Sequence, residues 1–105
     1  MFNFLKKIFG MTDNINLTEL IANGALLVDV RRPDEFAEGN APGSINIQHD
    51  TIQNHVKKLK DATQIIVFCR SGARAGFAKS TLEGLGFTNV TNGGTWQDVL
   101  AYVKA

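Results

Sequence analysis

Cysteine is almost absent from this chain of 105 residues, since Cys69 is the only one. No internal disulfide can therefore form. A zinc site is not expected either, because Cys69, His49 and His55 are the only soft metal ligands and they lack the paired spacing of zinc sites. Cys69 must therefore be either a buried apolar side chain or a reactive thiol.

Long apolar runs and an excess of charge are also lacking. No stretch approaches the ~20 apolar residues that a membrane-spanning helix needs. A formal net charge of +1 gives no broad basic field for nucleic-acid binding. Hydrophobic residues at 44% and charged residues at 20% are typical of a soluble globular protein, and the length predicts one small domain.

The first eleven residues, MFNFLKKIFGM, have neither a long apolar stretch nor a small-residue cleavage site, so they do not predict a secretory signal. As a helix they would be amphipathic, with Asn3, Lys6 and Lys7 on the polar side. This segment could lie on a membrane surface, but we favour packing on its own domain or fraying. We predict an amphipathic segment over 1–11 and a single domain over 12–105, in the reducing cytoplasm.

Strand and helix patterns alternate along the rest of the chain. Two runs, LLVDV at 26–30 and IIVF at 65–68, are apolar enough for strands buried on both faces of a parallel sheet. Shorter strands are predicted at 44–47 and 88–91, with a turn at Gly93 and Gly94. Helices are predicted at 17–23, 33–38, 51–60, 73–85 and 95–105. The alternation predicts an α/β domain with a mainly parallel sheet and helices on both faces.

Cys69 ends the second buried run, at the carboxyl edge of the predicted sheet, where the functional sites of such sheets lie. The residues CRSGARA, at 69–75, then form a tight loop that leads into a helix. In this geometry the backbone N–H groups and the positive end of the helix converge on one point. A cysteine at that point is favoured as the thiolate, so the sequence predicts a reactive thiol.

The side chains of the loop fit the same reading. Two add positive charge, one can donate a hydroxyl and two are small enough for the backbone to approach an anion closely: Arg70, Arg74, Ser71, Gly72 and Ala73. No histidine lies beside Cys69, so activation is expected from the loop and not from a Cys–His dyad.

Two of these residues have equally simple structural explanations. Arg70 can be a solvated loop side chain. Arg74 can be a structural tie to Asp29 or Glu35, and that role is compatible with one in the site.

Four stretches, in this order and spacing, resemble a single-domain rhodanese, a sulfurtransferase module. They are LLVDVRRPDEFAEGNAPGSINI (26–47), IIVFCRSGARA (65–75), GFAKSTLEGLGFTNVTN (76–92) and GGTWQDV (93–99). The resemblance covers most of residues 17–105, and residues 1–11 lie outside it.

The resemblance implies a rhodanese-like α/β fold with a five-stranded parallel sheet. It implies a sulfurtransferase that moves a sulfane sulfur from thiosulfate or a persulfide donor to cyanide or a thiol, through a Cys69 persulfide and without a cofactor. The sulfur would lie in a cradle of backbone N–H groups from Arg70 to Ala75. The structural support would come from Asp29, Arg31 and Glu35.

One departure from the family pattern is Asn40, which stands where a histidine usually follows the glycine of the acidic turn. We expect this change to alter packing or hydrogen bonding and not the chemistry. Related cysteine phosphatases and arsenate reductases use Cys-x5-Arg, whereas this chain has Cys69-x4-Arg74 with uncharged Ala75 next. The narrower loop favours a sulfur atom over a tetrahedral oxyanion.

Two other functions remain open. The chain can be a non-catalytic rhodanese-like binding module, although the intact Cys69 argues against this. It can also be a persulfide carrier in a relay, with a protein thiol as its sulfur acceptor. No nucleic-acid partner is expected.

Overall fold

Four parallel strands form the centre of the protein in the computed structural model, which describes residues 16–104. In sheet order they are β2-β1-β3-β4, so β3 is an inner strand that pairs with β1 and β4. The strands are β1 (Leu26–Asp29), β2 (Ile45–Asn46), β3 (Ile65–Cys69) and β4 (Val90–Thr95). The predicted parallel sheet is confirmed.

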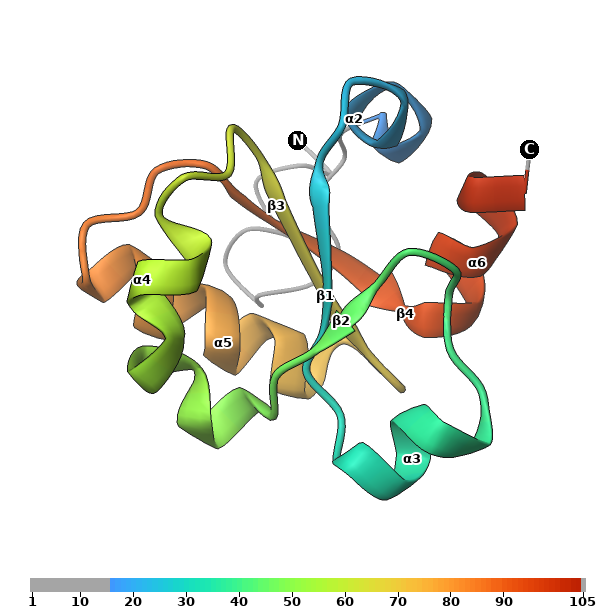
Figure 1. Ribbon diagram of the computed structural model, residues 1–105, viewed down its shortest axis with the longest axis horizontal. Coiled ribbons are helices and arrows are strands. Elements are labelled where there is room, and N and C mark those ends of the chain that lie inside the picture. The colour runs from blue at the N-terminus through green and yellow to red at the C-terminus, as the bar shows by residue number, and fades with distance from the viewer. Residues whose placement is uncertain (1–15, 105) are drawn as a thin grey trace, which may run out of the picture.

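Helices cover both faces of this sheet, as predicted (Figure 1). One layer contains the 3-10 helix η1 (His49–His55), α4 (Val56–Leu59) and α5 (Ala73–Gly84). The other contains α2 (Leu17–Ala22) and α6 (Trp96–Lys104), which also contact each other. The remaining helix, α3 (Pro33–Glu38), connects β1 to β2 beside the carboxyl edge of the sheet.

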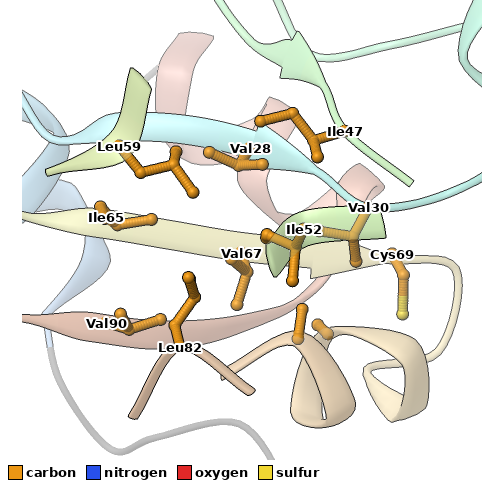
Figure 2. Close-up of a cluster of buried hydrophobic side chains, with 12 residues drawn as sticks. Val28, Val30, Ile47, Ile52, Leu59, Ile65, Val67, Cys69, Leu82 and Val90 are labelled. Atoms are coloured by element: carbon orange, nitrogen blue, oxygen red, sulfur yellow. The ribbon is translucent and has the colours of Figure 1, made fainter. Parts of the chain in front are cut away.

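The side chains of β3 alternate between the two helical layers, and every residue of this strand is buried. Ile65, Val67 and Cys69 join the cluster formed with η1, α4 and α5, which Figure 2 draws. Ile66 and Phe68 join the cluster formed with α2 and α6. This alternation explains the unbroken apolar run, because a strand with both faces covered has no polar side.

The resemblance implied five strands, and that number is wrong for residues 16–104, which form four. Each of the four segments predicted as strands from the residues themselves forms a strand of the sheet. The other apolar stretches of this region have helical spacing and lie in the two covering layers.

The predicted turn at Gly93 and Gly94 is also wrong, because both residues belong to β4. The register against β3 skips one residue here, with Asn92 opposite Val67 and Gly94 opposite Phe68. A Cβ on Gly93 would lie 2.8 Å from Cγ2 of Ile66, so this strand approaches its neighbours too closely for any larger residue. The glycines therefore make a β-bulge and not a turn.

The single helix predicted over 51–60 is two shorter pieces, η1 and α4. Thr51 donates its backbone N–H and its hydroxyl to the Gln48 carbonyl, an i→i+3 pattern that tightens the first turns. Ile52 and Leu59 are nevertheless fully buried, so the apolar face was placed correctly.

The amphipathic segment predicted at 1–11 lies outside the described residues. Among residues 16–104, no helix has the length and apolar character needed to cross a membrane.

Candidate active site at the carboxyl edge of the sheet

Cys69 is the last residue of β3 and is fully buried. Its thiol lies beside the start of α5, in the cluster that also contains Val30 and Ala75 (Figure 2). The Sγ atom accepts a hydrogen bond from the backbone N–H of Gly72 at 3.0 Å. The strand end, loop and helix start predicted from the sequence therefore do meet at the sulfur.

Gly72 adopts a φ of +97°, in the left-handed region that favours glycine. It is the N-cap of α5, and its carbonyl accepts the backbone N–H of Gly76 at 2.9 Å. Through its conformation the chain turns from β3 into the helix while the Gly72 N–H stays directed at Sγ. The sequence singled out this residue only for its small size.

The remaining loop residues divide into an outer and an inner group. Arg70, Ser71 and Ala73 are exposed, whereas Ala75 is fully buried in the core. The Ala73 N–H reaches only a long contact of 3.5 Å with the Ser71 hydroxyl. Side chains that could meet a substrate thus lie outside, while the backbone N–H of Gly72 contacts the sulfur.

Arg74 pairs with Glu35 of α3, which accepts two hydrogen bonds at 2.6 and 3.1 Å. The same carboxylate accepts the backbone N–H of Arg32 at 3.2 Å. The Arg74 hydrogen bond is the main reason why the pKa of Glu35 falls from 4.5 to about 2. The partner of Arg74, which the sequence left open between Asp29 and Glu35, is therefore Glu35.

Asp29 and Arg31 form a second, buried pair at the end of β1. The Nε and Nη2 atoms of Arg31 donate to the Asp29 carboxylate at 2.7–3.0 Å. Nη2 also donates to the Gly39 carbonyl at 2.7 Å. This pair holds the end of β1 against the segment after α3.

Trp96 completes this support in a way that the sequence did not indicate. The Arg31 guanidinium lies 4.7 Å from the centre of the Trp96 ring, a cation–π distance. A Cβ on Gly39 would lie 3.1 Å from the same ring, so Gly39 allows the close approach. The first residue of α6 thereby contacts the segment that follows α3.

Asn40 donates its side-chain amide to the Phe36 carbonyl at 2.9 Å. The residue found in place of the usual histidine therefore hydrogen-bonds the carboxyl end of α3 and is itself exposed.

Asn92 is the main residue that the sequence analysis missed. It is 1% exposed, and its side chain donates to the Gly72 carbonyl at 3.1 Å. Its signal in the sequence is an asparagine that directly follows a predicted strand and directly precedes two glycines.

The fold, with a buried thiol at a strand–loop–helix junction, defines a parallel α/β domain. The chain belongs to the rhodanese-like domain family. The family model matches residues 14–94.

The curated relatives include a sulfurtransferase of Allochromatium vinosum, 30% identical over 82 residues, which are 76% of this chain and 77% of that protein. The thiosulfate sulfurtransferase GlpE of Ectopseudomonas mendocina is 33% identical over 72 residues, which are 69% of this chain and 66% of that protein. These relatives support a sulfurtransferase of the rhodanese type.

Solved structures support the same fold. A rhodanese with anions from E. coli has a TM-score of 0.67 at 28% identity and matches 71% of this chain and 91% of that one. The human single-domain sulfurtransferase TSTD1 has a TM-score of 0.66 at 27% identity, over 81% and 89% of the two chains. The Bacillus anthracis CoADR-RHD structure has a TM-score of 0.73 at 28% identity, and this chain spans only 18% of its length.

Proposed function

We propose that this protein is a thiosulfate sulfurtransferase in which Cys69 is the nucleophile. The observation that carries the proposal is the hydrogen bond from the Gly72 N–H to Sγ, at the start of α5. Backbone donors and the positive end of a helix stabilise negative charge on sulfur, both in the thiolate and in a persulfide.

The reaction has two displacement steps. The Cys69 thiolate attacks the outer sulfur of thiosulfate, a new S–S bond forms, and the old S–S bond breaks with its electron pair leaving on sulfite. Cyanide or a thiolate then attacks the outer sulfur of the persulfide, which restores the Cys69 thiolate. No proton relay from a carboxylate is needed, and the loop donors act in both steps.

The exposed rim of the loop is the proposed binding site for the anionic donor. Arg70, Ser71 and Ala73 are the exposed residues of the loop, and Arg70 supplies the cation. Arg70→Ala is expected to raise KM for thiosulfate by about three- to tenfold, the effect of roughly 1 kcal/mol of charge-assisted hydrogen bonding. Arg32→Ala removes an equally exposed cation that already pairs with Asp34 and serves as the control. Equal KM values in the two variants would contradict the role of Arg70.

Sulfur transfer fits this loop better than phosphoryl chemistry. Arg74 is engaged by Glu35 at 2.6 Å, and Ala75 is uncharged and buried in the core. A phosphoryl group bound inside the loop would therefore have no free guanidinium beside it, since Arg70 is exposed at the rim, whereas a single sulfur needs only the backbone donors.

The decisive experiment is the mass of the intact protein after treatment with thiosulfate. Wild type should gain one sulfur atom, and cyanide should remove it with release of thiocyanate. Cys69→Ser should fold normally and gain nothing. A folded wild-type protein without the adduct would exclude the proposed reaction.

A protein sulfur relay is the second candidate. One relative, over 66 residues that make up 36% of its length, is a putative sulfur carrier protein YrkF of Bacillus subtilis. Fast transfer to one protein thiol with slow transfer to cyanide would favour the carrier. A partner that binds Cys69→Ala as well as wild type would favour a binding module. We place the protein in the cytoplasm as part of this proposal, because a reducing compartment keeps the thiol available.

A further inference from the structure

Asn92 is a polar side chain inside the core, and it joins two backbone segments. Its Nδ2 donates to the Gly72 carbonyl at 3.1 Å, and its Oδ1 accepts the Gly94 N–H at 2.9 Å. Burying an amide is unfavourable unless it is hydrogen-bonded. A buried asparagine in this strand therefore needs both segments in place.

The segment that Asn92 holds is the one that contacts the sulfur. Gly72 donates its N–H to Sγ of Cys69 at 3.0 Å. Because peptide groups are planar, holding the Gly72 carbonyl also fixes the direction of the next N–H, that of Ala73. Asn92 and the Gly76 N–H, at 2.9 Å, are the two donors to this carbonyl.

The β-bulge lies directly after Asn92. Asn92 is opposite Val67 in the regular register that begins at Val90, and the skip of Gly93 then puts Gly94 opposite Phe68. The Cα of Gly94 lies 3.6 Å from where a Cβ on Gly72 would be, so β4 and the loop touch. Bulges often re-aim a side chain next to a functional site, and here the side chain reaches the loop.

We propose that Asn92 is a positioning residue for sulfur transfer, which holds Gly72 so that its N–H stays directed at the sulfur. This inference rests on the proposed function, since it concerns the same thiol. Asn92 acts through the Gly72 carbonyl, to which its side-chain amide donates.

The test compares Asn92→Asp with Asn89→Asp. Asn89 also donates its side-chain amide to carbonyls, those of Ala62 and Thr63 at 2.8 and 3.0 Å, but just before β4 at the opposite edge of the sheet. Both variants lose an amide donor and gain a carboxyl group. The readouts are the rate of Cys69 alkylation by iodoacetamide across pH, and kcat and KM for thiosulfate.

Where the carboxyl group of Asn92→Asp is ionised, it faces the Gly72 carbonyl without a proton to donate, and its charge disfavours the thiolate of Cys69. The midpoint of the pH–rate curve should move upward by about one unit, which slows alkylation at neutral pH about tenfold. The value of kcat should fall while KM stays within about twofold, because the exposed rim is unchanged. Asn89→Asp should keep the wild-type curve. A wild-type curve in Asn92→Asp, or equal shifts in both variants, overturns the proposal.

Asn92→Ser covers the case in which the acidic variant does not fold. The serine hydroxyl can still accept the Gly94 N–H, but the side chain is too short to reach the Gly72 carbonyl. The alkylation rate and kcat should therefore fall again. Wild-type values of both would overturn the proposal. If neither variant folds, the test uses the NMR resonances of the side-chain amides in the wild-type protein. Those of Asn92 should shift when Cys69 is alkylated and those of Asn89 should not, and an unshifted Asn92 overturns the proposal.

Failure of the proposed function gives a different result. It leaves wild type without a sulfur adduct, while the alkylation comparison still tests Asn92.

Discussion

Arg31 and Arg32 are neighbours in the chain, but they differ in the burial of the side chain and of its partner, which decides how much each contributes to stability. The Arg31 side chain is 5% exposed and pairs with a fully buried Asp29, whereas the Arg32 side chain is 59% exposed. Arg31→Met should lower the free energy of unfolding by about 3–5 kcal/mol, because it leaves the Asp29 charge buried without a partner. Arg32→Met should change it by less than about 0.5 kcal/mol. Urea unfolding of both variants measures the difference, and similar losses would contradict the role of the buried pair.

Glu35 gives the ion pair with Arg74 a defined pH dependence. Its pKa is lowered from 4.5 to about 2, so its contribution to stability is complete above pH 4.5 and disappears as the pH falls through 2. Glu35→Gln should remove this dependence and lower stability at neutral pH by about 1 kcal/mol, the value for a partly exposed pair.

The control for Glu35 is Asp34→Asn. The Arg32 hydrogen bond also lowers the pKa of Asp34, but this carboxylate is 67% exposed. Thermal unfolding from pH 2 to 7 should separate Glu35→Gln from wild type and leave Asp34→Asn close to it. An unchanged pH profile in Glu35→Gln would refute the assignment.

Single residues divide clearly into those that the sequence could predict and those that it could not. The position of Cys69 follows from one apolar run and the loop after it. The Arg74–Glu35 pair joins residues 39 positions apart, so its choice between two carboxylates required the folded chain. The contact between Asn92 and Gly72 could not be predicted, because the two residues are 20 positions apart in the chain.

At the scale of elements, two glycines flank α5 in the same strained region of backbone space. Gly72 has φ +97° before the helix, and Gly86 has φ +100° after it. Alanine at either position should lower stability by about 1–2 kcal/mol, the penalty for left-handed backbone with a side chain. Only Gly72→Ala should also reduce sulfur transfer, because it moves the N–H that meets Sγ.

Thermal unfolding and kcat of Gly72→Ala and Gly86→Ala separate the two effects. Gly86 has open space around its Cβ position, so no collision complicates the control. Equal activity losses in the two variants would mean that the loop geometry is unimportant for the reaction.

Elements with a strong periodic pattern were predicted well, and elements shaped by packing were not. The unbroken run of β3 and the start of α5 at Ala73 agree with the sequence. The glycine pair of β4 predicts a turn, because glycine favours turns in isolation. Contact with Ile66 and Val99, at 2.8 and 3.2 Å from a Cβ on Gly93, overrides that preference.

At the scale of the molecule, one sheet separates two apolar clusters, and β3 contributes to both. Because both clusters share this strand, residues 16–104 should unfold as one cooperative unit. Leu82 is fully buried in one cluster, and Trp96, the only tryptophan, packs on the other.

Leu82→Ala should lower the free energy of unfolding by about 2–5 kcal/mol through loss of buried apolar contacts. Trp96 fluorescence and far-ultraviolet circular dichroism should shift together, although Trp96 lies across the sheet from the change. Leu85→Ala is the control, because that side chain is 51% exposed and should change stability little. Separate transitions for the two probes would disprove a single cooperative unit.

The N–H that contacts the sulfur belongs to the main chain. The group that stabilises the sulfur is therefore distinct from the side chains that would recognise a substrate. Every amino acid except proline carries that N–H, so exchanging the outward side chains at Arg70, Ser71 and Ala73 leaves it in place. The exposed side chains of the loop can thus be substituted to suit a new sulfur acceptor, while the backbone contact to the reactive sulfur stays the same.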